Sequence, residues 1–172
     1  MKRVLITFFL AVLLCSCGRQ EEARFFDYQD GEIDLECVIV YNGHENKVEI
    51  AASAPDESGV REKISVRYVS PEMIEGYTLE KNGGEYVGKM GSVEIPFGET
   101  VAGVVKYIDM AFSLNEDMIS NITAAENGLT EATVLSEELS GTVTTDSNGA
   151  PIKLDLSFSD GKTLVLSISG EE

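Results

Sequence analysis

The C-terminal part of the chain alternates between apolar and polar side chains with a strict period of two. From residue 152 to residue 158 the even-numbered residues are apolar, and Lys153, Asp155 and Ser157 lie between them. After a turn at Asp160-Gly161 the pattern continues through residues 163–169. Such alternation gives a strand one buried and one solvated face, which is typical of an antiparallel sheet covered on one side. This segment therefore restricts the chain to antiparallel β architecture.

Similar strand signals recur along most of the chain. The first predicted hairpin joins residues 33–41 to residues 47–53 through a turn at Asn42-Gly43, a dipeptide that readily takes the positive φ of tight hairpins. Further strands are predicted at 62–69, 77–81, 85–89, 92–95, 132–135 and 141–145. With the C-terminal hairpin, these segments predict roughly eight to ten strands, joined mostly by short turns.

One segment has a helical period instead. A helix is predicted by five apolar residues at helical spacing: Val101, Val104, Val105, Ile108 and Phe112. Asn115-Glu116-Asp117 is predicted to begin a second short helix that ends before Gly128. The expected fold class is therefore α+β, a mainly antiparallel curved sheet, or half-barrel, wrapped around one or two helices.

The N-terminus has the organisation of a bacterial export signal. Lys2 and Arg3 precede an apolar run over residues 4–14, which is too short to span a bilayer. Leu14, Ser16 and Cys17 fit a lipobox with Leu at −3, a small residue at −1 and Cys at +1, whereas Cys15 would have Leu14 at −1. We therefore predict a lipoprotein signal peptide at 1–16, lipidation of Cys17, a tether at 17–31 and a folded domain at 32–172.

Charge and localisation limit the partners. Removing residues 1–16 takes away two basic residues and no acidic ones, which leaves 11 basic residues, 30 acidic residues and a net charge of −19. Such a surface repels nucleic acid and anionic headgroups, so no nucleic-acid partner is expected. Membrane attachment is expected to come from the lipid on Cys17, at the extracytoplasmic face of the bacterial cell membrane.

The sequence contains no recognisable catalytic or metal-binding motif. Cys37 is the only cysteine left after processing and lies in a predicted strand, where it is expected to be a small buried side chain. His44 is the only histidine and lies in a turn, without a positioned serine or acid. We therefore predict a protein that is not an enzyme and has no cofactor and no metal site.

The C-terminal motifs resemble those of the LolA/LolB-like superfamily, and also small lipoproteins of Gram-positive bacteria. The motifs are Gly141-Thr142-Val143, Asp146, Asn148-Gly149-Ala150-Pro151 and Ser159-Asp160-Gly161-Lys162. The resemblance covers most of residues 33–169 and implies a half-barrel in which acyl chains sit between the concave sheet and its helix. The ligand-binding residues that it implies are Val104, Ile108, Phe112, Leu154, Leu156, Leu164 and Leu166.

Three functions follow as alternatives from these observations. The first is a membrane-anchored, non-catalytic binding or accessory domain for an acyl-containing ligand. The second is an envelope sensor module that binds a partner protein and whose core is packed shut, because apolar residues on such faces ordinarily form the core. The third, and weakest, is an envelope hydrolase. An open apolar cavity would favour a ligand, and a filled core would favour a partner.

Overall fold

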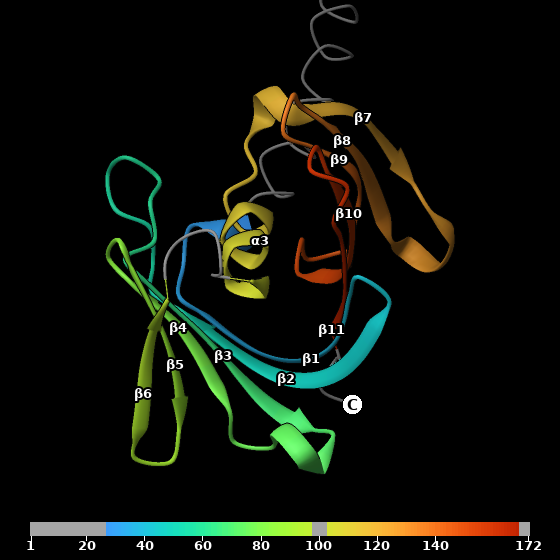
Figure 1. Cartoon of the computed structure of the whole chain (residues 1–172). Helices are drawn as coiled ribbons and strands as arrows, with labels where there is room; N and C mark the ends of the chain where they lie inside the picture. The colour runs from blue at the N-terminus through green and yellow to red at the C-terminus, as the bar shows by residue number, and fades with distance from the viewer. Residues whose placement is uncertain (1–26, 98–102, 169–172) are drawn as a thin grey trace, which may run out of the picture.

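Eleven antiparallel strands form one continuous sheet in the part of the chain that the computed structural model describes, residues 27–97 and 103–168. The strand order is β6-β5-β4-β3-β2-β1-β11-β10-β9-β8-β7, so every neighbour is a hairpin partner except the pair β1 and β11. That pair joins the N-terminal and C-terminal halves of the sheet. The sheet stays open between β6 and β7 and curves around the helix α3 (Figure 1).

The strands are β1 (Ile33–Tyr41), β2 (His44–Ala52), β3 (Lys63–Ser70), β4 (Thr78–Asn82), β5 (Glu85–Met90), β6 (Val93–Phe97), β7 (Ile119–Ala124), β8 (Thr130–Leu135), β9 (Leu139–Thr145), β10 (Pro151–Phe158) and β11 (Thr163–Ile168). The α-helix is α3 (Val104–Ala111), and short 3₁₀ turns occur at η1 (Asp27–Gln29), η2 (Glu72–Ile74), η4 (Glu116–Met118) and η5 (Glu126–Gly128). None of the helices within the described ranges is long and apolar enough to cross a membrane.

The core lies on the concave face of the sheet. In β10 and β11 the alternation predicted from the sequence is confirmed, because Leu154 pairs with Leu166 and Leu156 pairs with Leu164 on the concave face, and all four leucines are buried. Ile152 and Ile168, at the ends of these strands, are half-buried. In the N-terminal half, Val66 pairs with Ile50 on the same face. Cross-strand partners share a face of a sheet, so these pairs define the concave face across the fold.

The predicted second helix is wrong. Residues 115–128 instead form the turn η4, the strand β7 and the turn η5. Asn115-Glu116-Asp117 begins only the 3₁₀ turn η4, and a β-bulge between Ile119 and Asn121 then places Ile119 opposite Val134 and Ile122 opposite Ala132, both on the concave face. Two apolar residues three positions apart therefore point the same way, as they would in a helix. Among the described residues the sheet curves around one α-helix, and it has eleven strands.

Several predictions fall on residues outside the described ranges. These are the signal peptide at 1–16, the lipidated Cys17, most of the tether at 17–31 and Val101 of the predicted helix. The end of the tether is described, and there Tyr28 packs against the core and Gln29 is buried. The last residues before β1 thus belong to the packed body of the domain.

Candidate functional site

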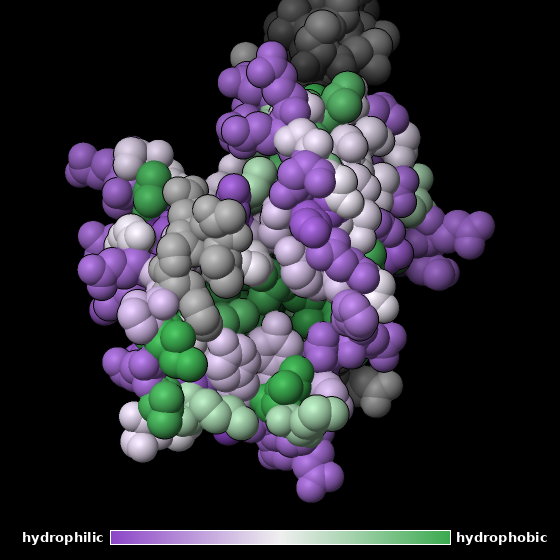
Figure 2. Space-filling view, viewed as in Figure 1, coloured by the Kyte–Doolittle hydropathy of each residue, from purple (hydrophilic) through white to green (hydrophobic). Residues whose placement is uncertain are grey.

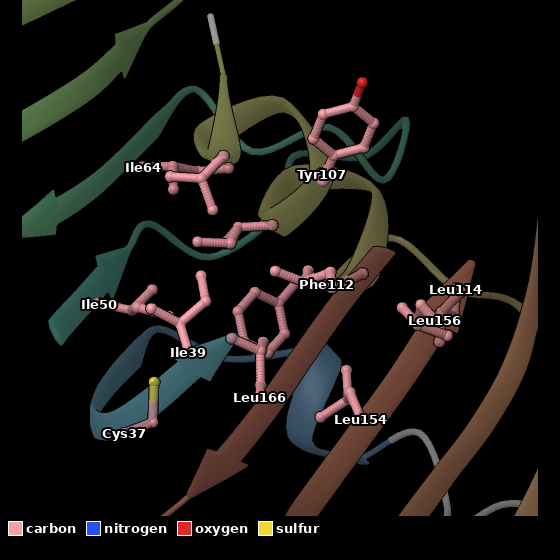
Figure 3. Close-up of a cluster of buried hydrophobic side chains, with 14 of the residues drawn as sticks. Cys37, Ile39, Ile50, Ile64, Tyr107, Phe112, Leu114, Leu154, Leu156 and Leu166 are labelled. Atoms are coloured by element: carbon pink, nitrogen blue, oxygen red, sulfur yellow. The ribbon is translucent and has the colours of Figure 1, made fainter. Parts of the chain in front are cut away.

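The structure brings the seven predicted ligand-binding residues together in one cluster. Val104, Ile108 and Phe112 come from α3 and the residue after it, and the four leucines come from β10 and β11 (Figure 3). Each of the seven is at most 2% exposed, because the helix side chains fill the concavity over these two strands. Here the space between helix and sheet is occupied by protein side chains.

The concave face is not covered to the same extent over β5 and β6. α3 contacts β3 and β4, and the apolar cross-strand row that contains Val66 continues through Leu79 and Gly88 to Ile95 at the edge. Ile95 is 51% exposed, and on the same face Met90 and Val93 are 48% and 57% exposed. One apolar row therefore runs from the buried core to the exposed Ile95, and Met90 pairs with Val93 beside it on the same face. We call these three residues the β5–β6 surface (Met90, Val93 and Ile95).

Figure 2 shows how this surface relates to the rest of the molecule. Apolar side chains line the floor of a recess between the β4–β6 side and the β8–β10 side of the sheet, and further apolar side chains lie exposed beside it. Gly88 lies between Leu79 and Ile95 in this row and is buried. The chain thus presents apolar surface next to its core.

Four tyrosines lie at one end of the concave face and form what we call the tyrosine rim (Tyr41, Tyr68, Tyr77 and Tyr107). The rings of Tyr41 and Tyr107 are 5.5 Å apart, and those of Tyr68 and Tyr77 are 6.0 Å apart. Burial raises the pKa of all four phenols, so their hydroxyls remain protonated donors at neutral pH. A phenol combines an apolar ring with a polar tip, which suits the boundary between an apolar interior and water.

The rim is fixed to the β10–β11 turn. Tyr107 packs on Phe158 at a ring distance of 4.5 Å, and its hydroxyl donates a 2.5 Å hydrogen bond to Oδ2 of Asp160. Burial and this bond raise the pKa of Tyr107, and the same bond lowers the pKa of Asp160. The sequence predicts Asp160 only as a turn residue. Tyr107 lies three residues after Val104, so the helical period already places it near the apolar face of the helix.

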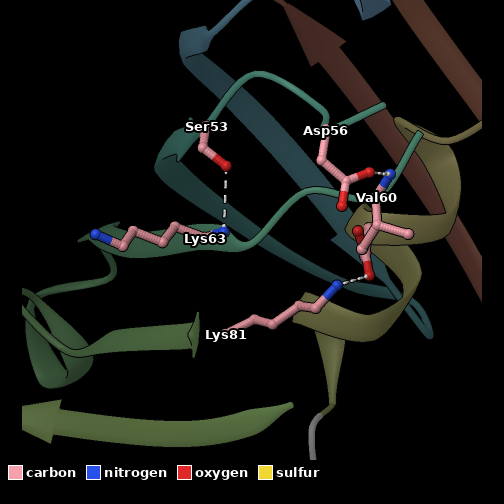
Figure 4. Close-up of polar contacts among 6 residues, drawn as sticks. Ser53, Asp56, Val60, Lys63 and Lys81 are labelled. Carbon is pink, nitrogen blue, oxygen red and sulfur yellow. Dashed lines mark hydrogen bonds and ion pairs between the residues drawn. The ribbon is translucent and has the colours of Figure 1, made fainter. Parts of the chain in front are cut away.

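An ion pair holds α3 against the sheet. Nζ of Lys81 on β4 lies 2.5 Å from Oδ2 of Asp109 on α3, and both side chains are largely buried (Figure 4). Lys81 pairs with Ile64 and Tyr86 across the sheet and therefore belongs to the concave face. This contact fixes the helix over β3 and β4 and leaves the β5–β6 surface beyond its reach.

Arg61 fastens the last residues before β1 to the rest of the domain. Its side chain is fully buried and donates hydrogen bonds to the backbone carbonyls of Gln29 (2.5 Å), Gly31 (2.8 Å) and Ser53 (2.5 Å), while its Nε has no partner. Burial lowers the pKa of the guanidinium, and the nearby Asp109 opposes that effect. No sequence pattern indicates this role, because Arg61 follows a polar loop and arginine is rarely fully buried.

The loop before Arg61 is ordered by one carboxylate. Oδ1 of Asp56 accepts hydrogen bonds from the backbone N–H groups of Ser58 (2.8 Å) and Val60 (3.0 Å; Figure 4). Gly59, at φ +79°, completes the turn, and Pro55 then pairs with Arg61 as an isolated bridge. The tight loop places Arg61 so that its side chain reaches the carbonyls of Gln29 and Gly31.

A depression of about 530 Å³ lies on the convex side of the sheet and is distinct from the predicted site. Its floor includes Ala51 and Ser65, and its walls include Asp34, Lys63 and Glu80. This mixture of carboxylates and lysine is unlike the apolar lining that an acyl chain requires.

The described residues offer little for catalysis or metal binding. Burial raises the pKa of the Cys37 thiol to about 12, so the thiol is protonated and unreactive at neutral pH, as expected for a buried strand residue. His44 is exposed at the start of β2. Residues 27–97 and 103–168 contain no group of three or more His, Cys, Asp or Glu side chains that could hold a metal ion.

Comparisons with known proteins give structural likeness only. No protein-family model and no curated protein sequence matches the chain. A LolA superfamily protein from Nitrosomonas europaea is similar over 87% of this chain and 89% of its own, with a TM-score of 0.46 and 12% identity. An outer membrane lipoprotein-sorting protein domain from Vibrio parahaemolyticus covers the same shares, with a TM-score of 0.45 and 10% identity.

A protein from Thermus thermophilus is similar over 88% of this chain and 84% of its own, with a TM-score of 0.44 and 11% identity. Similarity at this level does not indicate what the chain binds, so a ligand has to be inferred from the geometry of the chain itself. The resemblance to small lipoproteins of Gram-positive bacteria stays a prediction.

Proposed function

We propose that this chain is a bacterial lipoprotein, anchored by a lipid on Cys17 at the extracytoplasmic face of the membrane, whose domain binds an acyl-containing ligand without catalysis. The observation that carries the proposal is the continuation of the apolar core onto the β5–β6 surface, where Met90, Val93 and Ile95 are about half exposed. Burial of such side chains by an apolar ligand is favourable by about 25 cal/mol per Å² of apolar surface.

The dimensions of the surface suit a hydrocarbon chain. Val66 on β3 is fully buried, so the accessible part of the row runs across β4, β5 and β6, where two spacings of about 4.8 Å give a track of about 10 Å. In this proposal the acyl chain lies along the track, and the polar part of the ligand meets the hydroxyls of the tyrosine rim. The register places Tyr77 one step beyond the pair Thr78 and Lys89, next to Met90, so the rim and the track adjoin.

The partner-binding module remains the second candidate function, because a different observation favours it. All seven residues that were expected to line a ligand site are buried against one another. If the core is complete without a ligand, the β5–β6 surface would instead contact a protein of the envelope. An apolar exposed patch serves either purpose.

A titration with a fluorescent fatty acid distinguishes the two candidates. Protein lacking residues 1–17 should bind the fatty acid saturably at micromolar concentration, and Ile95→Glu should weaken binding at least about tenfold. Leu135→Glu is the matched control, because Leu135 is 61% exposed on the convex side of β8, and its binding should equal that of the unmodified protein. Absence of saturable binding would exclude the acyl ligand and leave the partner-binding module.

The anchor is tested separately in cells. Cys17→Ser should release the protein from the membrane and abolish metabolic labelling with palmitate. Labelling that persists in this variant and disappears in Cys15→Ser would show that Cys15 is the lipidated residue.

A further inference from the structure

The two open edges of the sheet differ in their ability to accept another strand. β6 contains Pro96, which has no backbone N–H to donate, and prolines of this kind protect the edges of natural sheets. β7 has the sequence Ile-Ser-Asn-Ile-Thr-Ala, without proline and without charge. Among the described residues, β8 is the only strand paired with β7, so its other edge is unpaired there. β7 therefore lacks the usual protection of an edge strand.

The hydrogen-bond pattern shows which backbone groups face the open edge. The N–H of Ala125 donates to the carbonyl of Leu129 at 2.8 Å, one step beyond the pair Ala124 and Thr130. Hydrogen-bonded and non-hydrogen-bonded pairs alternate in an antiparallel ladder. Ala124 and Ile122 are therefore in non-hydrogen-bonded pairs, and their N–H and carbonyl groups point away from β8.

The hydrogen bonds between β8 and β9 lead independently to the same assignment of outward-facing groups. The N–H of Ser136 donates to the carbonyl of Leu139 at 2.8 Å, so the alternation makes Val134 and Ala132 hydrogen-bonded to β9. The backbone groups of Ala132 are thus used on the β9 side, in agreement with a non-hydrogen-bonded pair between Ala132 and Ile122.

The electrostatic surroundings of β7 are strongly negative. Residues 107–152 contain eight acidic residues and no lysine or arginine. Among the described ion pairs, Asp109 is the only one of the eight that has a basic partner. On the convex face Glu131 of β8 lies opposite Thr123, one strand in from the open edge. A second copy of the chain would bring the same negative charge, whereas a basic segment would complement it.

We propose that β7 is a strand-addition site for an extended basic segment of a partner protein. The backbone groups of Ile122 and Ala124 would form the ladder with that segment. Every second side chain of the segment would be lysine or arginine on the convex face, and one of them would reach Glu131 across Thr123. The side chains between them would be apolar and lie beside Ile122, which is half-buried on the concave face. This surface is separate from the acyl track, so the two proposals stand or fall independently.

The test uses the full lipidated chain in nanodiscs of phosphatidylcholine and a fluorescent peptide, acetyl-Lys-Val-Lys-Val-Lys-Val-amide. Anisotropy should show saturable binding that weakens as salt rises from about 0.05 M to about 0.5 M. The same peptide N-methylated at alternate amides keeps its charge but cannot form the ladder, and it should bind at least about tenfold more weakly. A peptide with glutamate in place of lysine should also bind at least about tenfold more weakly. Equal affinity of the N-methylated peptide would refute strand addition.

Two variants at one residue locate the site. Ala124→Pro removes an outward N–H from an exposed position, and it should weaken peptide binding about tenfold, whereas Ala124→Ser keeps the N–H and should bind like the unmodified protein. Hydrogen exchange should show new protection in residues 119–124 and none in residues 93–97, a readout that does not require either variant to fold. Protection elsewhere, or a β7-dependent dimer in sedimentation that excludes the peptide, would overturn the proposal.

Discussion

Replacement of Arg61 by methionine is the most informative perturbation of the fold. Arg61 is fully buried, and its guanidinium supplies donors to the carbonyls of Gln29, Gly31 and Ser53. Methionine fills a similar volume and supplies no donor. The substitution therefore removes the polar contact that joins residues 29–31 to the end of β2, and it leaves the apolar core unchanged.

The expected loss of stability follows from the surroundings of each carbonyl. The hydrogen bond to Gln29 is buried, and an acceptor left unsatisfied there costs about 1–3 kcal/mol. The bonds to Gly31 and Ser53 are part-buried, so water replaces the donor and each loss costs about 0.5–1.5 kcal/mol. Removing a buried charge recovers some desolvation free energy, which gives a net loss of about 2–4 kcal/mol.

Urea denaturation of Arg61→Met measures this loss directly, with Arg67→Met as the matched control. Arg67 is exposed on β3 and pairs with Glu49 at 3.0 Å, so its replacement should change stability by less than about 0.5 kcal/mol. Limited proteolysis of Arg61→Met should also show faster cleavage near residues 27–31. Equal stability of the two variants would refute the role that we assign to Arg61.

Three further outcomes are expected. Leu156→Asp should cost at least about 3 kcal/mol, because Leu156 is fully buried, whereas the exposed Asp155→Asn should be near neutral in the same thermal denaturation. Gly141→Ala should cost about 3 kcal/mol or more by urea denaturation, since a Cβ at φ +153° would lie 2.0 Å from the Asp155 carbonyl oxygen. Tyr107→Phe should raise the pKa of Asp160 in a carboxyl NMR titration. Folding lowers the pKa of Asp160, so the bond from Tyr107 stabilises the protein when Asp160 is ionised. The unmodified protein should therefore be more stable than the variant above the ordinary carboxyl pKa of about 3.9, and this difference in the free energy of unfolding should disappear as pH falls through the folded pKa.

The strands could be predicted from the sequence because their side-chain period can be read directly. In β10 the apolar residues alternate without interruption, and the structure buries Leu154 and Leu156 as expected. β7 could not be predicted in this way, because the bulge at residue 120 changes its period locally. A bulge depends on pairing with a neighbouring strand, and a single segment of sequence does not show that pairing.

The candidate site was predictable in part for a related reason. The seven apolar residues cluster because helix and strand periods identify which residues face the core. The β5–β6 surface was not predicted, since its exposure depends on where α3 lies and not on the local pattern around Ile95. Arg61 and the tyrosine rim depend on contacts between distant segments, such as the 2.5 Å bond from Tyr107 to Asp160.

The short length of α3 connects the two proposals. Its eight residues give a helix about 12 Å long and about 10 Å wide, whereas eleven strands at about 4.8 Å make a face about 48 Å across. One such helix can cover only the middle of the sheet, which leaves apolar surface at β5–β6 and an unpaired backbone at β7. These surfaces lie at opposite ends of the sheet (Figure 1), so acyl binding and strand addition can occur on one molecule at the same time. In the double variant, Ile95→Glu should therefore weaken fatty-acid binding and Ala124→Pro should weaken peptide binding by the same amounts as in the single variants, because substitutions at distant sites act independently.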